Sequence, residues 1–191
     1  DMGGTSADVS RVDGAFDYHD RHEVGLALVS APSLKIETVA AGGGSVCRLD
    51  GDLLAVGPES AGAHPGPACY GFGGPLCLTD VNLLLGRLSP EHFATPVFPR
   101  EAEGRLQEIL EVGDRSRDET LLGFLEVAND VMAGAIRKVS VREGYDPAEY
   151  CLVAFGGAGG QHACGVAEKL GITRILSPAD AGLLSAYGLS R

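Results

Sequence analysis

The chain has 191 residues, of which 45% are hydrophobic, and this is enough for a domain with a substantial core. Its net charge of −11 excludes a general nucleic-acid surface, because such a surface needs clustered Lys and Arg. The sequence contains no run of about 18 apolar residues, so it predicts no membrane span.

The cysteines and the first residues predict a reduced, cytoplasmic protein. The five cysteines form no CxxC pair and no zinc-type spacing, and the acidic, glycine-rich start does not resemble a signal peptide. An odd number of cysteines without a signal favours free thiols in the cytoplasm. Cys151 and Cys164 lie among apolar residues, so we expect both to be small core residues.

The first part of the sequence predicts short antiparallel strands. Residues 7–12 and 15–19 alternate around Asp13-Gly14, which is a favoured hairpin turn. Residues 25–29 predict a further strand.

The opening segment DMGGTSADVS contains a glycine turn but has no apolar strand before it. We therefore expect a strand to precede Asp1 in a longer polypeptide, of which residues 1–191 form one domain. Further along, residues 45–49 and 53–57 predict a second hairpin across residues 50–52.

Residues 57–78 form an unusual segment, GPESAGAHPGPACYGFGGPLCL. Its many Pro and Gly residues exclude both a helix and a regular strand. Because apolar residues are interleaved with them, we expect an ordered loop that is buried or faces a ligand. Loops of this length inside a domain are usually functional.

Three helices are predicted after this loop, over residues 79–88, 101–113 and 117–144. Thr79 or Asp80 is the expected N-cap of the first. The third has the clearest helical period, which is carried by Leu121, Leu125, Ala128, Met132, Ile136 and Val139.

The last part of the sequence predicts a strand over residues 151–155, a helix over 161–170, a strand over 174–176 and a helix over 179–187. A strand–helix–strand order at this spacing is typical of a βαβ unit with a parallel pair. The expected architecture is therefore α/β, with hairpins first, then helices and a βαβ unit.

The segment DMGGTSAD is the first candidate site. Gly3 and Gly4 free the backbone to curl, so that successive N–H groups can converge on an anion. Carboxylates would repel a phosphate but suit a Mg²⁺ shell or a positioned water. A simple glycine turn with solvated acids is the alternative. The polar side chains of the segment are those of Asp1, Thr5, Ser6 and Asp8.

The turn GGAGG, residues 156–160, is the second candidate site. It lies between a predicted strand and a predicted helix, where N–H groups and the positive helix end suit a phosphate or nucleotide. A dinucleotide-binding Rossmann unit is disfavoured, because the GxGxxG pattern is absent and no acidic residue ends the next strand. His162, in the first helical turn, can bond a ligand, or it can cap the helix or lie in the core.

Two further features are ambiguous. Gly42-Gly43-Gly44 is a third glycine loop, and three such loops are costly because each loses backbone entropy on folding. Glu59 and His64 are polar groups in the long loop. If buried together, they can do acid–base chemistry or form a local hydrogen-bond lock.

Five stretches together resemble the hydantoinase A/5-oxoprolinase family. They are DMGGTSADVS, VAAGGGS, VGPESAGAHPGPACYG, TDVNLLLGRL and AFGGAGGQHACGVAEKLGI…LLSAYGL, in the order found in the family and over nearly the whole chain. The string PESAGAHPGPACYG is highly specific. The forms VAAGGGS and GGAGGQHAC look closer to 5-oxoprolinases than to N-methylhydantoinases or acetone carboxylase subunits.

The resemblance implies an actin/hexokinase-like (ribonuclease H-like) ATPase fold, in which two related domains close around a nucleotide. Residues 1–5 match the second domain's phosphate-facing hairpin, and residues 156–160 match its glycine turn near the nucleotide. The first domain's hairpin and the other large domain of a 5-oxoprolinase, of the hydantoinase B type, have no counterpart in the sequence. We therefore expect one half of an ATPase cleft, inactive by itself and a homo-oligomer in its full-length form.

The resemblance also implies a reaction in glutathione metabolism: ATP-coupled hydrolysis of 5-oxo-L-proline to L-glutamate, with Mg²⁺. A lactam is a stable amide, so transfer of a phosphoryl group to its oxygen would make it a better electrophile for water. The implied phosphate-binding residues are Gly3, Gly4, Thr5 and Ser6, with Asp1 holding Mg²⁺ or water. The implied nucleotide-binding residues are Gly156, Gly157, Gly159, Gly160 and His162. The catalytic candidates are Asp1, Asp8, Glu59 and His64.

Other functions stay open at this point. Within the family, the alternatives are an N-methylhydantoinase or an acetone carboxylase-type subunit. Outside it, the chain can be a non-catalytic nucleotide-binding or assembly domain. A small-molecule kinase of the same fold is a third alternative, which would release a phosphorylated product instead of inorganic phosphate.

Overall fold

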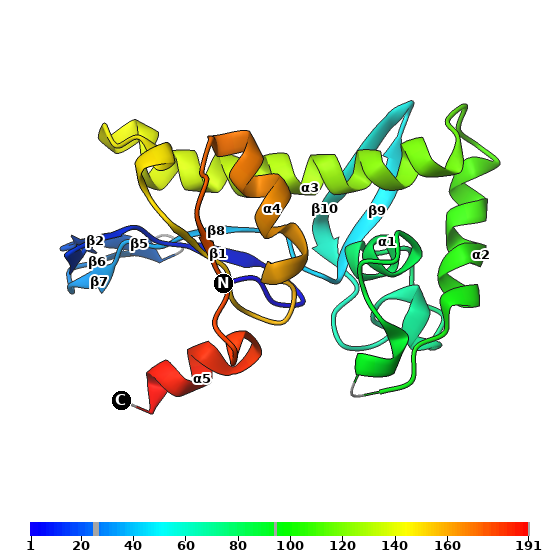
Figure 1. The fold of residues 1–191 in the computed structure, drawn as a ribbon, viewed down its shortest axis with the longest axis horizontal. Coiled ribbons are helices and arrows are strands. Elements are labelled where there is room, and N and C mark those ends of the chain that lie inside the picture. The colour runs from blue at the N-terminus through cyan, green and yellow to red at the C-terminus, as the bar shows by residue number, and fades with distance from the viewer. Residues whose placement is uncertain (25–26, 94, 191) are drawn as a thin grey trace.

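The computed structural model describes residues 1–24, 27–93 and 95–190. Most of the short two-stranded sheets lie toward one side of the molecule, the strand pair of residues 45–60 lies toward the other, and one long helix, α3 (Arg117–Val139), runs across all of it (Figure 1). Each sheet is too small to form a core of its own, so the chain is held together mainly by strands and helices that pack against α3.

The predicted turn at Gly14, which has a φ of +73°, is confirmed, but its hairpin is shorter than the predicted strands over 7–12 and 15–19, because residues 7–9 and 18–19 pair with other strands. The central pair is β1 (Ala7–Val9) with β8 (Glu37–Val39), antiparallel, with Ala7 opposite Val39. The other pairs are β2 (Val12–Asp13) with β3 (Ala15–Phe16), β4 (Tyr18–His19) with β7 (Ser33–Leu34), and β5 (His22–Val24) with β6 (Ala27–Val29). Residues 25 and 26 of the predicted strand over 25–29 lie outside the described residues.

The second predicted hairpin is also confirmed. Strand β9 (Ser45–Asp50) pairs with β10 (Leu53–Ser60), with Leu53 opposite Asp50. The register shifts between Val56 and Ser60, and there β10 turns toward the long loop.

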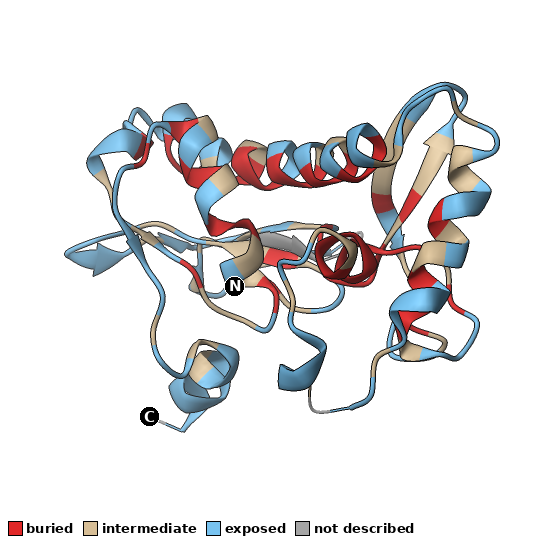
Figure 2. Cartoon of the chain, turned by 45° about the vertical axis from the view of Figure 1, so that its right-hand side comes forward, coloured by how far each residue is buried: buried red, intermediate tan, exposed pale blue. Residues whose placement is uncertain are grey.

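The helices follow the apolar pattern of the sequence. They are α1 (Leu78–Leu84), α2 (Pro99–Leu110) and α3 (Arg117–Val139). Ser116 and Glu119 form a capping box that starts α3, and Pro99 occupies the first position of α2. The face of α3 that turns toward the strands is buried (Figure 2), and Phe124, fully buried, lies in this core.

The N-cap of α1 differs from the prediction of Thr79 or Asp80. Cys77 is the N-cap, and Asp80 lies at the third helical position, where its carboxylate accepts from the Cys77 N–H. The helix therefore begins earlier than expected, because Asp80 serves the cap from inside the first turn.

The C-terminal part contains the predicted βαβ unit. Strand β11 (Leu152–Val153) is parallel to β12 (Ile175–Leu176), and α4 (Gly159–Leu170) connects them and packs on α3. A short helix, α5 (Leu184–Leu189), follows. No helix in the described part of the chain is long and apolar enough to cross a membrane.

The expectation for two cysteines was wrong. Cys151 and Cys164 are exposed, whereas Cys47, Cys69 and Cys77 are buried, and all five are free thiols. Cys164 has apolar neighbours in the sequence, but α4 buries Ala163, Val166, Ala167 and Leu170 at helical spacing, so Cys164 falls on the outer face.

Candidate functional site

The hairpin at Gly3–Ser6 is the first part of the site. The Gly3 N–H donates to the Ser6 carbonyl over 3.1 Å, which leaves Gly4 and Thr5 at the exposed corner. Met2 and Ala7 pair across the hairpin and bury their side chains in the core. The core thus anchors the hairpin while its corner faces outward.

The turn at residues 156–160 packs directly against this hairpin. The Met2 N–H donates to the Phe155 carbonyl over 3.0 Å, and the Ala158 N–H donates to the Met2 carbonyl over 2.9 Å. Gly156 has a φ of +83°, and a Cβ there would lie 2.2 Å from Asp1 Oδ1. Only glycine fits this contact, so the two bends are built as one unit.

The third glycine loop joins the same unit. The Gly43 and Gly44 N–H groups donate to the carbonyls of Gly3 and Gly4 over 3.0 and 2.6 Å. A Cβ on Gly42 would lie 2.6 Å from the backbone of Thr5. Residues 3–5, 42–44 and 156–160 therefore form one contiguous unit, which we call the glycine cluster, and residues 42–44 are its buried part.

Part of the glycine cluster is open toward solvent. A Cβ added to Gly3, Gly4, Gly157 or Gly160 would meet nothing within 4 Å, and none of these glycines has a left-handed φ. Packing within the chain therefore does not require glycine at these positions. The N–H groups of Gly4, Thr5, Gly157, Gly159 and Gly160 have no hydrogen-bond acceptor among the described residues. Such a row of bare donors at a helix N-terminus suits an anion.

The two acidic residues of the hairpin lie opposite each other on its outer face. Asp1 and Asp8 pair through two backbone hydrogen bonds, of 2.9 and 2.8 Å. Their side chains have separate partners: Ser185 Oγ donates to Asp1 Oδ2, and Thr38 Oγ1 donates to Asp8 Oδ1, both over 2.6 Å. Asp1 alone of the two lies against Gly156.

Asp1 lies beside the glycine cluster, against Gly156, and its carboxylate suits a metal ion. The described residues contain no group of three or more His, Cys, Asp or Glu side chains that could hold a metal ion. A Mg²⁺ ion at Asp1 would therefore need phosphate oxygens and water to complete its shell. This donor set fits the way Mg²⁺ is usually held beside nucleotides.

His162 lies beneath the glycine cluster and not on its surface. The ring is 1% exposed, with Nδ1 2.9 Å from Asn129 Oδ1 and Nε2 3.2 Å from Asn82 Nδ2. Nδ1–H therefore donates to Asn129 while Nε2 accepts from Asn82. Burial, with a smaller contribution from Arg87, lowers the pKa of His162 to about 4, so the ring is neutral at pH 7. These contacts favour the core alternative for His162.

Sequence reasoning did not identify the residues that support the cluster from below. Asn82 and Asn129 connect α4 to α1 and α3 through His162, and Thr79 donates from both its N–H and its hydroxyl to the Gly43 carbonyl. The sequence did contain a sign of this role, namely polar residues inside otherwise apolar helices. Such polar side chains are buried only where they have hydrogen-bond partners.

Asp80 organises the long loop, and its role was not predicted beyond capping. The carboxylate is fully buried and accepts from the N–H groups of Ala68, Cys69 and Cys77 over 2.8–3.0 Å. Burial raises the pKa of Asp80, although these three donors oppose the shift, and burial also raises the pKa of the Cys77 thiol to about 12. Residues 61–77, which we call the clasped loop, are therefore fixed around one carboxylate.

Glu59 and His64 do not form a buried pair. Both are exposed; Glu59 Oε2 lies 2.9 Å from Arg48 Nη1, and the His64 ring lies 5.5 Å from the Phe72 ring. The burial on which both suggested roles of this pair depended is therefore absent, because β10 carries Glu59 on its solvent face and the tip of the clasped loop turns outward at His64.

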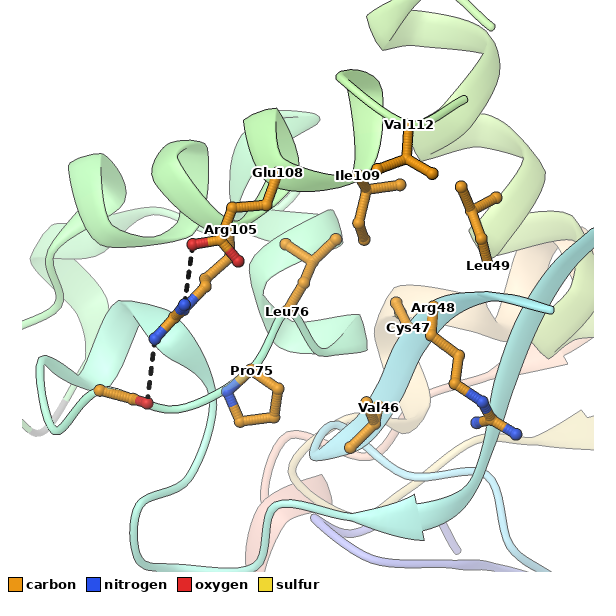
Figure 3. Close-up of a pocket in the computed structure, with 11 residues that line it drawn as sticks. Val46, Cys47, Arg48, Leu49, Pro75, Leu76, Arg105, Glu108, Ile109 and Val112 are labelled. Atoms are coloured by element: carbon orange, nitrogen blue, oxygen red, sulfur yellow. Dashed lines mark hydrogen bonds and ion pairs between the residues drawn. The ribbon is translucent and has the colours of Figure 1, made fainter. Parts of the chain in front are cut away.

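A cavity of about 530 Å³ lies away from the glycine cluster, between β9 and α2 (Figure 3). Its walls are mainly aliphatic, with one ion pair, Arg105–Glu108, at 2.8 Å. Arg105 also donates to the carbonyls of Gly73 and Gly74. The cavity contains none of the predicted site residues, so it is not the candidate nucleotide site.

Comparison with known proteins places the chain in a family. The family model described as hydantoinase/oxoprolinase matches residues 1–190. The 5-oxoprolinase PfmaA of Pestalotiopsis fici is 48% identical over 100% of this chain, which spans 16% of that relative's length. The predicted family is therefore confirmed, and the chain corresponds to a minor part of its longer relatives.

Solved structures agree with this result. The crystal structure of the ATP-dependent caprolactamase from Pseudomonas jessenii matches with a TM-score of 0.87 and 35% identity. A nucleotide-free acetone carboxylase structure, from work on ATP-dependent acetone carboxylation, matches with a TM-score of 0.85 and 28% identity. Each match covers 98% of this chain and 28% of the other chain, and both support the predicted α/β ATPase-like fold. The chain belongs to the hydantoinase/oxoprolinase family.

Proposed function

We propose that this chain forms one wall of the nucleotide cleft in an ATP-dependent cyclic-amide hydrolase. The proposed reaction converts 5-oxo-L-proline, ATP and water to L-glutamate, ADP and phosphate. The observation that carries this proposal is the glycine cluster, in which three segments distant in sequence pack together and two of them, residues 3–5 and 156–160, expose unpaired N–H groups.

The chemistry of the cluster supports a polyphosphate as its ligand. The corner N–H groups of Gly4 and Thr5, and those of Gly157 and Gly160, would bind phosphate oxygens without any cationic side chain. Asp1 beside Gly156 would hold Mg²⁺ or orient a water, and Ser185 fixes the position of its carboxylate. His162, buried below, would position the first turn of α4 and would not contact the ligand.

The division of work follows from these contacts. ATP, when bound, would supply the phosphoryl group that makes a stable amide reactive. The chain's own contribution would be to hold the phosphates in one place with donors that need no reorganisation. This chain would supply the phosphate-binding groups of only one of the two domains that close around the nucleotide. The isolated chain should therefore hydrolyse little or no ATP.

The choice of 5-oxoproline rests on the relatives. Curated 5-oxoprolinases share 40–48% identity with this chain, including those of Dictyostelium discoideum and Arabidopsis thaliana. The caprolactamase alpha subunit of Pseudomonas jessenii is 36% identical. A different cyclic amide is therefore the main alternative substrate.

The test is a substrate screen on the full-length protein. ATP-dependent opening of 5-oxoproline is compared with that of hydantoins and caprolactam, and glutamate and phosphate are measured. Equal amounts of glutamate and phosphate are expected. A phosphorylated product without free phosphate would indicate a kinase, and no turnover with any substrate would indicate a non-catalytic domain.

Gly4→Ala tests the cluster itself. Its Cβ meets nothing in this chain, so the Tm should not change. We expect kcat/KM for ATP to fall at least about tenfold, because the methyl group covers the corner donors. Gly104→Ala in α2, also exposed and with open space, is the matched control and should keep full activity. Unchanged kinetics in Gly4→Ala would contradict the proposed phosphate site.

A further inference from the structure

Arg87 lies just beyond the end of α1, and its exposed side chain reaches the first turn of α4. α1 ends in a Schellman motif at Gly86, which has a φ of +71°. The N–H groups of Gly86 and Arg87 donate to the carbonyls of Leu83 and Asn82 over 3.0 and 2.9 Å. This motif fixes the backbone of Arg87, and its Nη1 donates to the Gln161 carbonyl over 2.9 Å.

The bond to Gln161 places the guanidinium beside the glycine cluster. Gln161 directly follows Gly160, and its side-chain amide donates to the Gly157 carbonyl over 3.4 Å. The charge of Arg87 also contributes to the lowered pKa of His162, which lies beneath the cluster. In the described part of the chain, no other Lys or Arg side chain bonds to the cluster or to a residue next to it.

The guanidinium of Arg87 has unused donors and no acidic partner. Among the described residues, no Asp or Glu forms an ion pair with it, and only Nη1 has an acceptor. By contrast, Arg105 uses Nε, Nη1 and Nη2 on two carbonyls and Glu108. Nε and Nη2 form one fork of a guanidinium, and such a fork binds a phosphate in bidentate fashion. Arg87 can therefore take a phosphate without losing Gln161.

The position is unfavourable for a cation unless an anion shares it. The first turn of α4 is the positive end of the helix, where a further positive charge is destabilising. The carboxylate of Asp1 is bonded to Ser185 and forms no ion pair with Arg87. A triphosphate carries several negative charges, and the partial charges of backbone N–H groups balance only part of them. A phosphate beside Arg87 would satisfy both needs.

We propose that Arg87 binds a phosphate oxygen of the nucleotide at the glycine cluster. Its Nη1 keeps the bond to Gln161, while Nε and Nη2 donate to the phosphate. The guanidinium supplies the full positive charge that the backbone of the cluster lacks. This inference rests on the proposed nucleotide cleft, to which it adds a side chain that the sequence did not indicate.

The test measures the binding of ATP with Mg²⁺ to the full-length protein by calorimetry at low and high salt. Arg87→Gln removes the charge but keeps an N–H₂ group that can donate to the Gln161 carbonyl, and Arg87→Lys keeps the charge without the fork. Arg174→Gln is the matched control. Arg174 is also exposed, has no acidic partner among the described residues, and donates to the Glu149 carbonyl over 2.9 Å.

Arg87→Gln should raise the Kd for ATP at least about tenfold. The Kd of this variant should also depend less on salt than that of the wild-type protein, because one contact between a charge and a phosphate is lost. Arg87→Lys should lie between the two, since a point charge remains. Arg174→Gln should bind ATP as the wild-type protein does.

Two results would overturn the inference while the proposed function stands. The first is wild-type affinity for ATP in Arg87→Gln, combined with impaired use of ATP in Gly4→Ala. The second is equal weakening in Arg87→Gln and Arg87→Lys with the salt dependence of the wild-type protein, since Arg87 would then only connect α1 to α4. Failure of the wild-type full-length protein to bind ATP would overturn both the inference and the proposed function.

Discussion

The glycine cluster and the clasped loop are both dense in glycine, but their backbone N–H groups have different hydrogen-bond partners. In the clasped loop, the N–H groups of Ala68, Cys69 and Cys77 end on the buried Asp80 carboxylate. In the glycine cluster, those of Gly4 and Thr5 end in solvent. Glycine density is therefore not itself a sign of a ligand surface, whereas the destination of the N–H groups distinguishes the two cases.

The glycines themselves differ in the same way. Gly74 is required inside the clasped loop, because a Cβ there would lie 1.9 Å from the Gly66 carbonyl oxygen. Gly3 and Gly4 have open space and no left-handed φ, so nothing within the chain requires them. The clasped loop needs Gly74 for its own packing, whereas the outer corner of the glycine cluster, at Gly3 and Gly4, leaves room for something outside the chain.

The largest expected effect is that of Gly74→Ala. The new methyl group would meet backbone atoms that cannot move without opening the clasped loop, so we expect a loss of at least about 3 kcal/mol in the free energy of unfolding. Urea unfolding measures this loss. Gly157→Ala, at an exposed site with open space, is the control and should lose less than about 0.5 kcal/mol. Equal losses in both variants would remove the distinction between the two regions.

Asp80→Asn should have the next largest effect. An amide keeps one acceptor oxygen and turns an NH₂ group toward at least one of the three N–H donors, so we expect a loss of about 2–4 kcal/mol. Circular dichroism during urea unfolding provides the measurement. The exposed Asp50, changed to Asn, serves as the control. A stable Asp80→Asn variant would mean that the clasped loop holds its shape without the carboxylate.

The buried ring of His162 predicts that the stability of the chain depends on pH. Its pKa of about 4 lies below the unfolded value of about 6.5, so the unfolded state binds more protons between these values. Stability should therefore fall as the pH falls, by about 2 kcal/mol between pH 7 and pH 5.

The comparison variant for this pH effect is His162→Gln. The raised pKa of Asp80 acts in the opposite sense, since its contribution to stability is lost as the pH rises through that pKa. Both proteins share this contribution, so the difference between them isolates His162. If the two proteins lose equal stability between pH 7 and pH 5, the neutral, buried ring is not the cause.

The smallest effect is expected for Glu59→Gln. The ion pair with Arg48 is exposed, so its loss should change the free energy of unfolding by less than about 0.5 kcal/mol. Measured in the full-length protein, a large loss of turnover with unchanged stability would instead support the predicted catalytic role of Glu59.

The sequence predicted most elements that depend on local patterns. The period of α3, the β9–β10 hairpin and the βαβ unit follow from residues close in sequence. The pairing of β1 with β8 was not predicted, because about thirty residues separate the two strands and neither carries a turn signal for the other.

The candidate site was predictable in part. Glycine-dense turns beside predicted strands indicated the segments of the cluster, because glycine allows the tight bends that bring backbone N–H groups together. Their hydrogen bonds to one another, such as that from Gly43 to Gly3, depend on tertiary packing. The same is true of Asn82 and Asn129, whose partner His162 is distant in sequence from both.

The two hydrogen bonds of the His162 ring have a mechanical consequence. They tie the start of α4 to α1 and α3, so this helix end cannot tilt independently without stranding buried amides. No hinge is therefore expected between the turn at residues 156–160 and the rest of the chain. In the proposed nucleotide cleft, domain movement should carry all three helices together as a rigid body.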